Sequence, residues 1–128
     1  MNAFTPLEAI APQLLADGYL ARAIHGDSLT MAIVEIGPGA ELPEHRHDNE
    51  QLGLVIEGSV RFRVGSEERI LGPGETWRIT SNSRHAVRAG DGGALVMDVF
   101  SPPRDDWRTL AELDSRPPTG RLPDRGGC

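Results

Sequence analysis

The chain has 128 residues, of which 38% are hydrophobic and 25% charged, and its formal net charge is −6. These values are typical of one soluble globular domain, and the negative charge argues against nucleic acid as a partner. No apolar run is long enough to cross a membrane, the first 15 residues lack the features of a signal peptide, and the single cysteine, Cys128, excludes a disulfide framework. We therefore expect a cytoplasmic protein that binds neither nucleic acid nor membrane.

Residues 1–18 are expected to form an N-terminal arm with one short helical turn. Thr5 is a suitable N-cap for this turn, Pro6 suits the first helical position, and Glu8 completes a capping box. Pro12 then ends or restarts the turn.

The central part, residues 19–103, carries many short segments with the alternating or apolar character of β-strands, separated by turns rich in glycine and proline. The expected strands cover residues 19–24, 29–36, 51–57, 59–64, 70–71, 76–79, 84–89 and 94–100. The first strand is expected at the edge of a sheet, and turns are expected at Glu57-Gly58 and Asp91-Gly92-Gly93. Since no segment suits a helical crossover between parallel strands, the pattern predicts an all-β sandwich or barrel.

The pattern changes after the double proline that precedes residue 104. Residues 104–114 are expected to form a short C-terminal helix with Trp107, Leu110 and Ala111 on one face. Residues 115–128 are rich in proline, glycine and arginine, so we expect a flexible tail. The sequence shows no internal repeat, which indicates a single domain.

A group of candidate metal ligands begins at His45. His45 and His47 stand two apart on an extended chain, so their imidazoles point to the same face, and Gln51 returns to that face four residues later. His85 is the obvious candidate for a fourth donor, because the remaining histidine, His25, lies in a turn and is expected to be solvated. We expect these four residues to hold one divalent transition metal ion: zinc, nickel, manganese, iron or copper.

Two alternatives remain open for this group. Glu50 takes the place of Gln51 as a ligand if the strand register shifts by one residue, although the parity of the positions favours Gln51. The histidine pair can also lie in an exposed loop and bind no metal.

Asp98 is a second residue that needs an explanation. It stands in the middle of an expected strand among apolar neighbours, where a carboxylate requires either a partner or a task. Arg104 follows shortly after and can form a structural salt bridge with Asp98. Alternatively, Asp98 is a site carboxylate and Arg104 binds a carboxylate of the substrate bidentately.

The spacing of these residues resembles the two sequence motifs of the cupin family. The residues at the positions of the first motif are Gly39, His45, His47, Gln51 and Gly58, with glutamine where the family usually has glutamate. The residues at the positions of the second motif are Gly74 and His85, whereas Thr80, Asn82 and Ala89 replace its usual proline, glycine and asparagine. The resemblance implies a single cupin, which is a jelly-roll barrel (a double-stranded β-helix), followed by the short C-terminal helix.

The run Asp-Val-Phe-Ser-Pro-Pro-Arg-Asp-Asp, which begins at Asp98, further resembles small cupins of the KdgF-like pectin-degradation type. The resemblance implies a metal-dependent lyase or isomerase that opens the ring of unsaturated uronates to give 5-keto-4-deoxyuronate. It implies a small anionic sugar or carboxylate as substrate, and a homodimer. It also implies that Asp98 carries a proton, that Phe100 forms an apolar wall, and that Arg104 holds the substrate carboxylate.

Two other functions remain open at this stage. One is a cupin dioxygenase or another metal-dependent small-molecule enzyme, although Gln51 does not supply the anionic ligand of a facial triad. The other is a non-catalytic cupin that binds a small ligand, because such a protein would keep the same metal and pocket.

Overall fold

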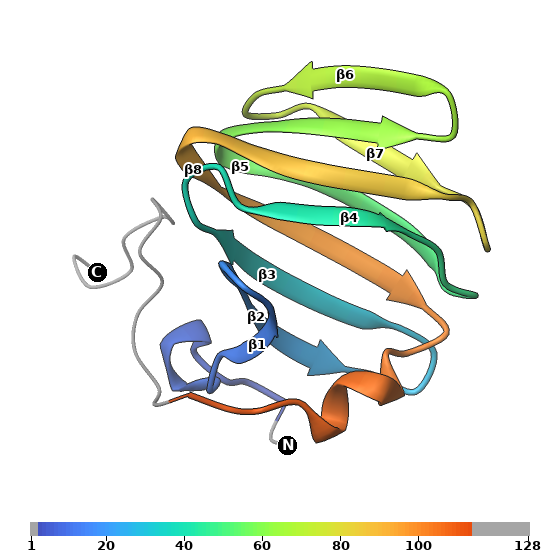
Figure 1. The fold of residues 1–128 in the computed structure, drawn as a ribbon. Helices are drawn as coiled ribbons and strands as arrows, with labels where there is room; N and C mark the ends of the chain where they lie inside the picture. The colour runs from blue at the N-terminus through green and yellow to red at the C-terminus, as the bar shows by residue number, and fades with distance from the viewer. Residues whose placement is uncertain (1–2, 114–128) are drawn as a thin grey trace.

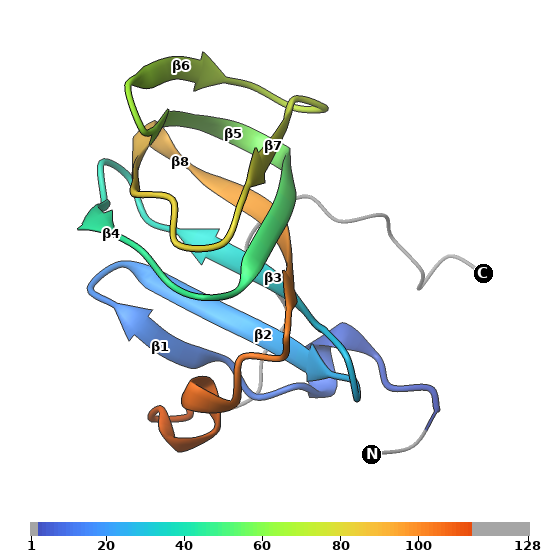
Figure 2. The same cartoon turned by 90° about the vertical axis from the view of Figure 1, so that its right-hand side faces the viewer.

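In the computed structural model of the chain, residues 3–113 are described, and they form an eight-stranded antiparallel sheet that curls over itself (Figure 1). The strands are β1 (Gln13–Ala16), β2 (Tyr19–His25), β3 (Thr30–Ile36), β4 (Glu41–His45), β5 (Glu50–Val64), β6 (Glu67–Leu71), β7 (Thr76–Ile79) and β8 (His85–Ser101). Their order is β1-β2-β3-β8-β5-β6, with β4 paired to β8 and β7 paired to β5. The turned view shows the sheet rolled up so that its strands face one another, and the expected all-β jelly roll is confirmed (Figure 2).

The long strands β5 and β8 run through the whole roll and pair with each other along both halves. The turns expected at Glu57-Gly58 and Asp91-Gly92-Gly93 are wrong as strand ends, because both strands bend there and continue. Gly58 has a φ of +81°, and a Cβ added to it would lie 2.2 Å from the carbonyl oxygen of Gly93. Glycine therefore serves at the bend, where the two backbones come too close for a side chain.

The inner face of the roll is lined by apolar and aromatic side chains. The ring of Phe62 lies 4.8 Å from that of Trp77, and the ring of Phe100 lies 5.1 Å from that of Trp107. The buried hydroxyl of Tyr19 on β2 lies 3.1 Å from the carbonyl oxygen of Val87 on β8, to which it donates. This bond joins two strands that are not neighbours in the sheet and satisfies the polar end of a buried aromatic side chain.

The N-terminal arm differs from its prediction in two respects. Its helical turn is the 3₁₀ turn η1 (Leu7–Ala9), which starts after Pro6 and has no side-chain cap, so Thr5 is not the N-cap. The arm also contributes β1 to the sheet, and β1 pairs with β2. The strand that begins at Tyr19 is therefore not an edge strand.

The C-terminal helix expected over residues 104–114 is wrong, because only the 3₁₀ turn η2 (Asp105–Thr109) forms. The chain that follows runs alongside β1. The backbone amide of Leu14 donates to the carbonyl oxygen of Ala111 at 3.1 Å, and the amide of Leu113 donates to the carbonyl oxygen of Pro12 at 2.8 Å. These strand-like bonds use the backbone groups that a longer helix would need for itself. The tail expected over residues 115–128 lies outside the described residues.

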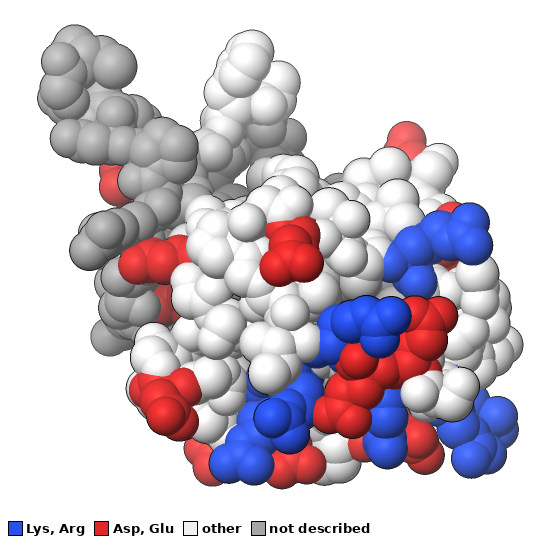
Figure 3. All heavy atoms as spheres, turned by 90° about the horizontal axis from the view of Figure 1, so that it is seen from above, with Lys and Arg blue, Asp and Glu red and all other residues white. Residues whose placement is uncertain are grey.

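The face of the molecule on the β6 side carries interleaved acidic and basic side chains (Figure 3). Exposed ion pairs join different strands here, such as Arg61 on β5 to Glu68 on β6 at 3.7 Å and Arg63 on β5 to Glu44 on β4 at 3.3 Å. Because both signs alternate, this face does not present a field of one sign. Within residues 3–113, no helix has the length and apolar character needed to span a membrane.

Candidate metal centre

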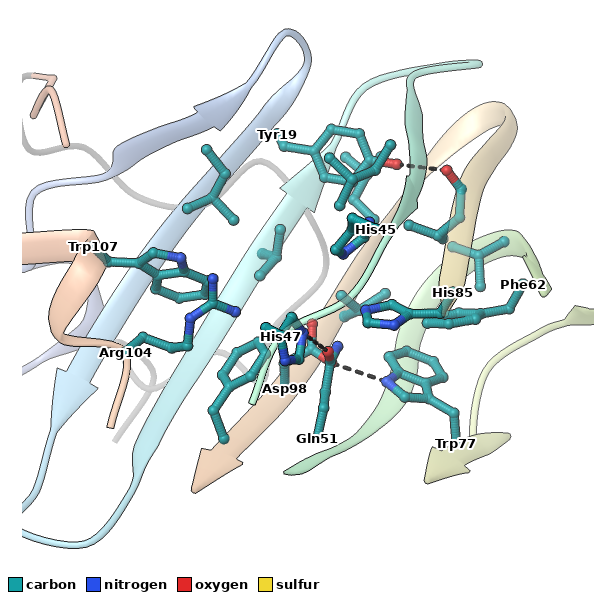
Figure 4. Close-up of a pocket in the computed structure, with 18 of the residues that line it drawn as sticks. Tyr19, His45, His47, Gln51, Phe62, Trp77, His85, Asp98, Arg104 and Trp107 are labelled. Atoms are coloured by element: carbon teal, nitrogen blue, oxygen red, sulfur yellow. Dashed lines mark hydrogen bonds between the residues drawn. The ribbon is translucent and has the colours of Figure 1, made fainter. Parts of the chain in front are cut away.

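Three histidines from separate segments meet at the central pocket (Figure 4). His45 ends β4 and His85 begins β8, and the two residues are partners in the β4–β8 ladder. His47 lies in the loop after β4. One ring nitrogen from each of these residues, here called the histidine cluster, lies within 4.8 Å of the other two. This spacing allows all three to bind one ion.

Each ring in the histidine cluster has a backbone carbonyl oxygen beside its Nδ1. In each ring, Nδ1 lies within hydrogen-bond distance of a backbone carbonyl oxygen. These contacts are His45 to Pro43 at 2.8 Å, His47 to Asn49 at 3.0 Å and His85 to Ser83 at 2.9 Å. A carbonyl accepts only from N–H, so the tautomer with its proton on Nδ1 satisfies all three carbonyls and keeps the lone pair on Nε2. The lone pairs needed for metal binding are therefore available.

The burial of His85 supports the fit to a metal. Its Nε2 is buried and has no hydrogen-bond partner in the described part of the chain. Burial lowers the pKa of His85 to about 4, although the bond to the Ser83 carbonyl opposes the shift. Burial also lowers the pKa of His47, and the charge of Arg104 lowers it further. Both rings are therefore neutral at pH 7, which is the form that binds metals.

Gln51 lies beside His47 in the pocket and completes the donor set. Its side chain is buried, and its carbonyl oxygen Oε1 lies 3.1 Å from Nε2 of His47. A neutral ring has one N–H and cannot donate to both Asn49 and Gln51. With the proton on Nδ1, Nε2 and Oε1 face each other with lone pairs, and a shared cation would relieve this unfavourable contact. Glu50 is exposed at the start of β5 and does not line this pocket.

Asp98 lies beneath Gln51 and is bound by two side chains. Its Oδ1 accepts hydrogen bonds from Nε2 of Gln51 at 2.8 Å and from Nε1 of Trp77 at 2.9 Å. Burial raises the pKa of Asp98 to about 6, although these two bonds and the charge of Arg104 lower it. A carboxyl group with such a pKa can both give and take a proton near neutral pH.

Arg104 forms the other end of the pocket and does not form the salt bridge with Asp98 that was one interpretation of the sequence. Its Nε and Nη2 donate to the carboxylate of Asp106 at 3.1 and 3.0 Å. Its guanidinium carbon lies 4.8 Å from the ring centre of Phe100 and 4.6 Å from that of Trp107. The side chain is only 13% exposed and lines the pocket. The guanidinium is therefore held in place and can bind an anion.

The pocket has a volume of about 280 Å³ and two distinct surfaces. One surface carries the histidine cluster, Gln51, Asp98 and Arg104, and the other is formed by apolar side chains from β2, β3, β4 and β8. Phe100 is buried at the boundary, with its ring 5.8 Å from that of His47. Such a pocket suits a small anionic molecule with an apolar side.

Sequence reasoning placed each of these candidates around the one pocket but missed Trp77, Asp106 and Trp107 as members of it. A signal for Trp77 was present, because the alternation of residues 76–79 places Trp77 and Ile79 on one buried face. A buried indole N–H needs an acceptor, which is a reason to search for one. His25 lies apart from the histidine cluster, half-buried at the end of β2, with Nδ1 2.8 Å from the hydroxyl of Thr30.

Comparisons with known proteins agree with this architecture. Residues 32–100 match the cupin domain family. The chain is 34% identical over 95 residues to the pectin degradation protein KdgF of Dickeya dadantii (strain 3937), covering 73% of this chain and 86% of that protein. It is 33% identical over 101 residues to the tetracenomycin polyketide synthase protein TcmJ of Streptomyces glaucescens, covering 73% of this chain and 66% of that protein.

Solved structures show the same fold. KdgF from Halomonas sp. superposes with a TM-score of 0.76 at 28% identity, over 83% of this chain and 98% of that chain. An RmlC-like cupin from Shewanella frigidimarina superposes with a TM-score of 0.77 over 83% of this chain and 96% of that chain. At 22% identity, the second likeness shows the fold alone.

Proposed function

The chain belongs to the cupin family, and from its site we propose that it is a metal-dependent enzyme that opens the ring of unsaturated uronates to give 5-keto-4-deoxyuronate. The observation that carries the proposal is that one pocket holds a neutral donor set, a buried carboxyl group with a raised pKa, and a fixed guanidinium. The similarity to KdgF supports the same substrate class.

The residues that would hold the metal are His45, His47, His85 and Gln51. None of these four side chains is a carboxylate or a thiolate, so the ligands add no negative charge to a bound divalent ion. When bound, the metal supplies Lewis acidity toward the oxygen atoms of an anionic substrate. The unpartnered Nε2 of His85 and the facing lone pairs of His47 and Gln51 support this assignment.

Arg104 and Asp98 would act directly on the substrate. Arg104 would bind the carboxylate of the uronate and so orient the ring. Ring opening is an isomerisation: the bond between the anomeric carbon and the ring oxygen breaks, the anomeric hydroxyl loses its proton, and the ring oxygen becomes an enol. The enol becomes a ketone when its O–H loses a proton and the neighbouring alkene carbon gains one, and Asp98 would take the first proton and give the second. Phe100 would pack against the apolar part of the ring.

A second candidate is a different metal-dependent small-molecule enzyme, such as a dioxygenase. The apolar surface of the pocket favours it, because that surface also suits a ligand with fewer hydroxyl groups than a sugar. The donor set speaks against oxygen chemistry, since it lacks the carboxylate of a facial triad. A protein that only binds a ligand does not need a carboxyl group with a raised pKa, so Asp98 favours an enzyme over a binding protein.

The test is to mix the purified protein with an unsaturated uronate monosaccharide and follow the ultraviolet absorbance of the alkene. The expected result is faster loss of absorbance, with the linear keto acid identified by NMR, no uptake of oxygen, and loss of the rate when metal is chelated. Oxygen uptake with an aromatic substrate would favour the second candidate. Tight binding of the uronate without turnover would indicate a binding protein.

The homodimer and the cytoplasmic location stay predictions. Apolar side chains lie across the outer face of the sheet, where Met31 and Leu52, which are 36% and 46% exposed, both pair with Val99 in the ladders. Sedimentation measurements on the wild type and on Leu52→Glu would test whether this face joins two copies.

A further inference from the structure

The side chains of Trp77 and Asp98 are hydrogen-bonded to each other although their strands are not neighbours. Trp77 lies on β7 and Asp98 on β8, and β5 runs between them with Gly53 as the ladder partner of both residues. Two strand spacings, about 10 Å, separate the outer backbones. The indole of Trp77 crosses this gap over Gly53, and its Nε1 donates to Oδ1 of Asp98 at 2.9 Å.

Gly53 provides the space for this crossing. A Cβ added to it would lie 2.4 Å from both Cε2 and Nε1 of Trp77. These atoms belong to the edge of the indole that carries the N–H donor. Any larger residue at position 53 would therefore push the donor away from Asp98.

The bond from Trp77 determines how the carboxylate of Asp98 is turned. Oδ1 receives the bonds from both Trp77 and Gln51, and within residues 3–113 no hydrogen bond to Oδ2 is formed. The end of the Gln51 side chain that faces Asp98 is therefore its amide nitrogen, which donates to Oδ1. The carbonyl oxygen of Gln51 must then point the other way, toward His47.

We propose that Trp77 is a positioning residue that acts on the metal site through Asp98 and Gln51. It holds Oδ1 of Asp98 in place beside Gln51. An acceptor oxygen in that place binds the amide N–H, which leaves the amide oxygen facing the histidine cluster. A flipped amide would present N–H groups, which cannot bind a cation. The inference rests on the metal site of the proposed function and deepens it, because it assigns the orientation of one ligand to a residue that is not itself a ligand.

The first experiment measures metal binding without any substrate. The full-length protein is stripped of metal and titrated with Co²⁺, and affinity and visible absorption are recorded for Trp77→Phe, Asp98→Ala and the double variant. Phenylalanine keeps a ring beside Phe62 but removes the N–H. The expected result is about tenfold weaker Co²⁺ binding with an altered spectrum for Trp77→Phe. No further loss is expected when Trp77→Phe is added to Asp98→Ala.

Glycine variants give an independent route to the same answer, which also serves if Trp77→Phe fails to fold. Gly53→Ala keeps the indole but displaces it, and it should weaken Co²⁺ binding to a similar extent. Gly92→Ala on β8 is the matched control, since a Cβ there meets nothing within 4 Å. Its affinity should equal that of the wild type.

Kinetics with the uronate separate positioning from binding. Trp77→Phe should lower kcat about tenfold with little change in KM, whereas Trp107→Phe, beside Arg104, should mainly raise KM. The inference is overturned if Trp77→Phe binds Co²⁺ with wild-type affinity and spectrum, or if its effect adds fully to that of Asp98→Ala. Should the wild type fail to turn over uronates, the proposed function fails, while the Co²⁺ titrations still decide the role of Trp77.

Discussion

The two sides of the metal site differ in what holds their donor atoms. On one side, the histidine cluster is oriented by backbone carbonyl oxygens. On the other side, Gln51 is oriented by the side chains of Asp98 and Trp77. Backbone carbonyls remain when neighbouring side chains change, whereas the Gln51 side depends on the identity of two residues far away in the sequence. The first side is thus robust to substitution around it, and the second can be altered from a distance.

The largest effect is expected when a ligand is removed from the histidine cluster. His47→Ala is expected to lose most of the bound metal and reduce turnover to background, because two imidazoles and an amide are a poor site for a divalent ion. Metal content after gel filtration measures the first effect. His25→Ala is the matched control, since His25 lies outside the histidine cluster, and it should keep wild-type metal content. Equal metal in both variants would show that the cluster is not the site.

A smaller effect is expected from changing the chemistry of the other side while keeping its geometry. In Asp98→Asn, the side-chain oxygen can still accept from Trp77, so the fold and most of the metal should be retained. The kcat should fall by about 10²–10⁴-fold, because the residue can no longer carry a proton. Stopped-flow or steady-state absorbance measures the rate, and circular dichroism checks the fold. An unfolded Asp98→Asn protein would instead mark Asp98 as structural.

The pH dependence of stability gives a second test of Asp98, with Asp98→Asn as the reference. The pKa of Asp98 rises from 3.8 to about 6 on folding, so the folded state binds more protons than the unfolded state between these values. Its contribution to stability is present below pH 3.8 and is lost as the pH rises through 6. The unfolding free energy of metal-free wild type, relative to Asp98→Asn, should therefore fall by on the order of 3 kcal/mol between pH 4 and 7. Urea titrations at both pH values measure this difference, and a constant difference would contradict it.

The smallest effect is expected at Arg104, outside the metal site. Arg104→Lys keeps the charge but loses the planar group that lies against Phe100 and Trp107. KM for the uronate should rise about tenfold with little change in kcat, because lysine cannot bind a carboxylate bidentately. Arg108→Lys, on the exposed side of η2, is the control and should have wild-type KM. An unchanged KM in Arg104→Lys would remove Arg104 from substrate binding.

Much of the site could be predicted because it depends on local parity. Two-residue spacing on an extended chain places His45 and His47 on one face, and Gln51 faces the same pocket. Trp77 could not be found this way, because its bond to Asp98 depends on β5 lying between β7 and β8. That order is a property of the whole sheet, and no local pattern encodes it.

The wrong predictions of the fold have a similar origin, because they too depended on tertiary contacts. A glycine such as Gly58 suits a chain reversal and a bend within a strand equally well, and only the close passage of Gly93 decides between them. The helical pattern around Trp107 and Leu110 is real, but the segment after η2 also lies within reach of the unpaired side of β1. Strand-like pairing there ends the helix early, which is a tertiary effect on a weak local preference.

The pairing of the C-terminal segment with β1 has a consequence for aggregation. The sheet order ends at β1 and β6, and a free strand edge is a template for pairing with another chain. β6 begins with the charged residues Glu67, Glu68 and Arg69, which discourage such pairing, while β1 is covered through the bridge from Gln13 to Glu112. Trimming the chain after Leu110 would uncover β1, and we expect the shortened protein to form β-rich aggregates during storage that the full chain does not form.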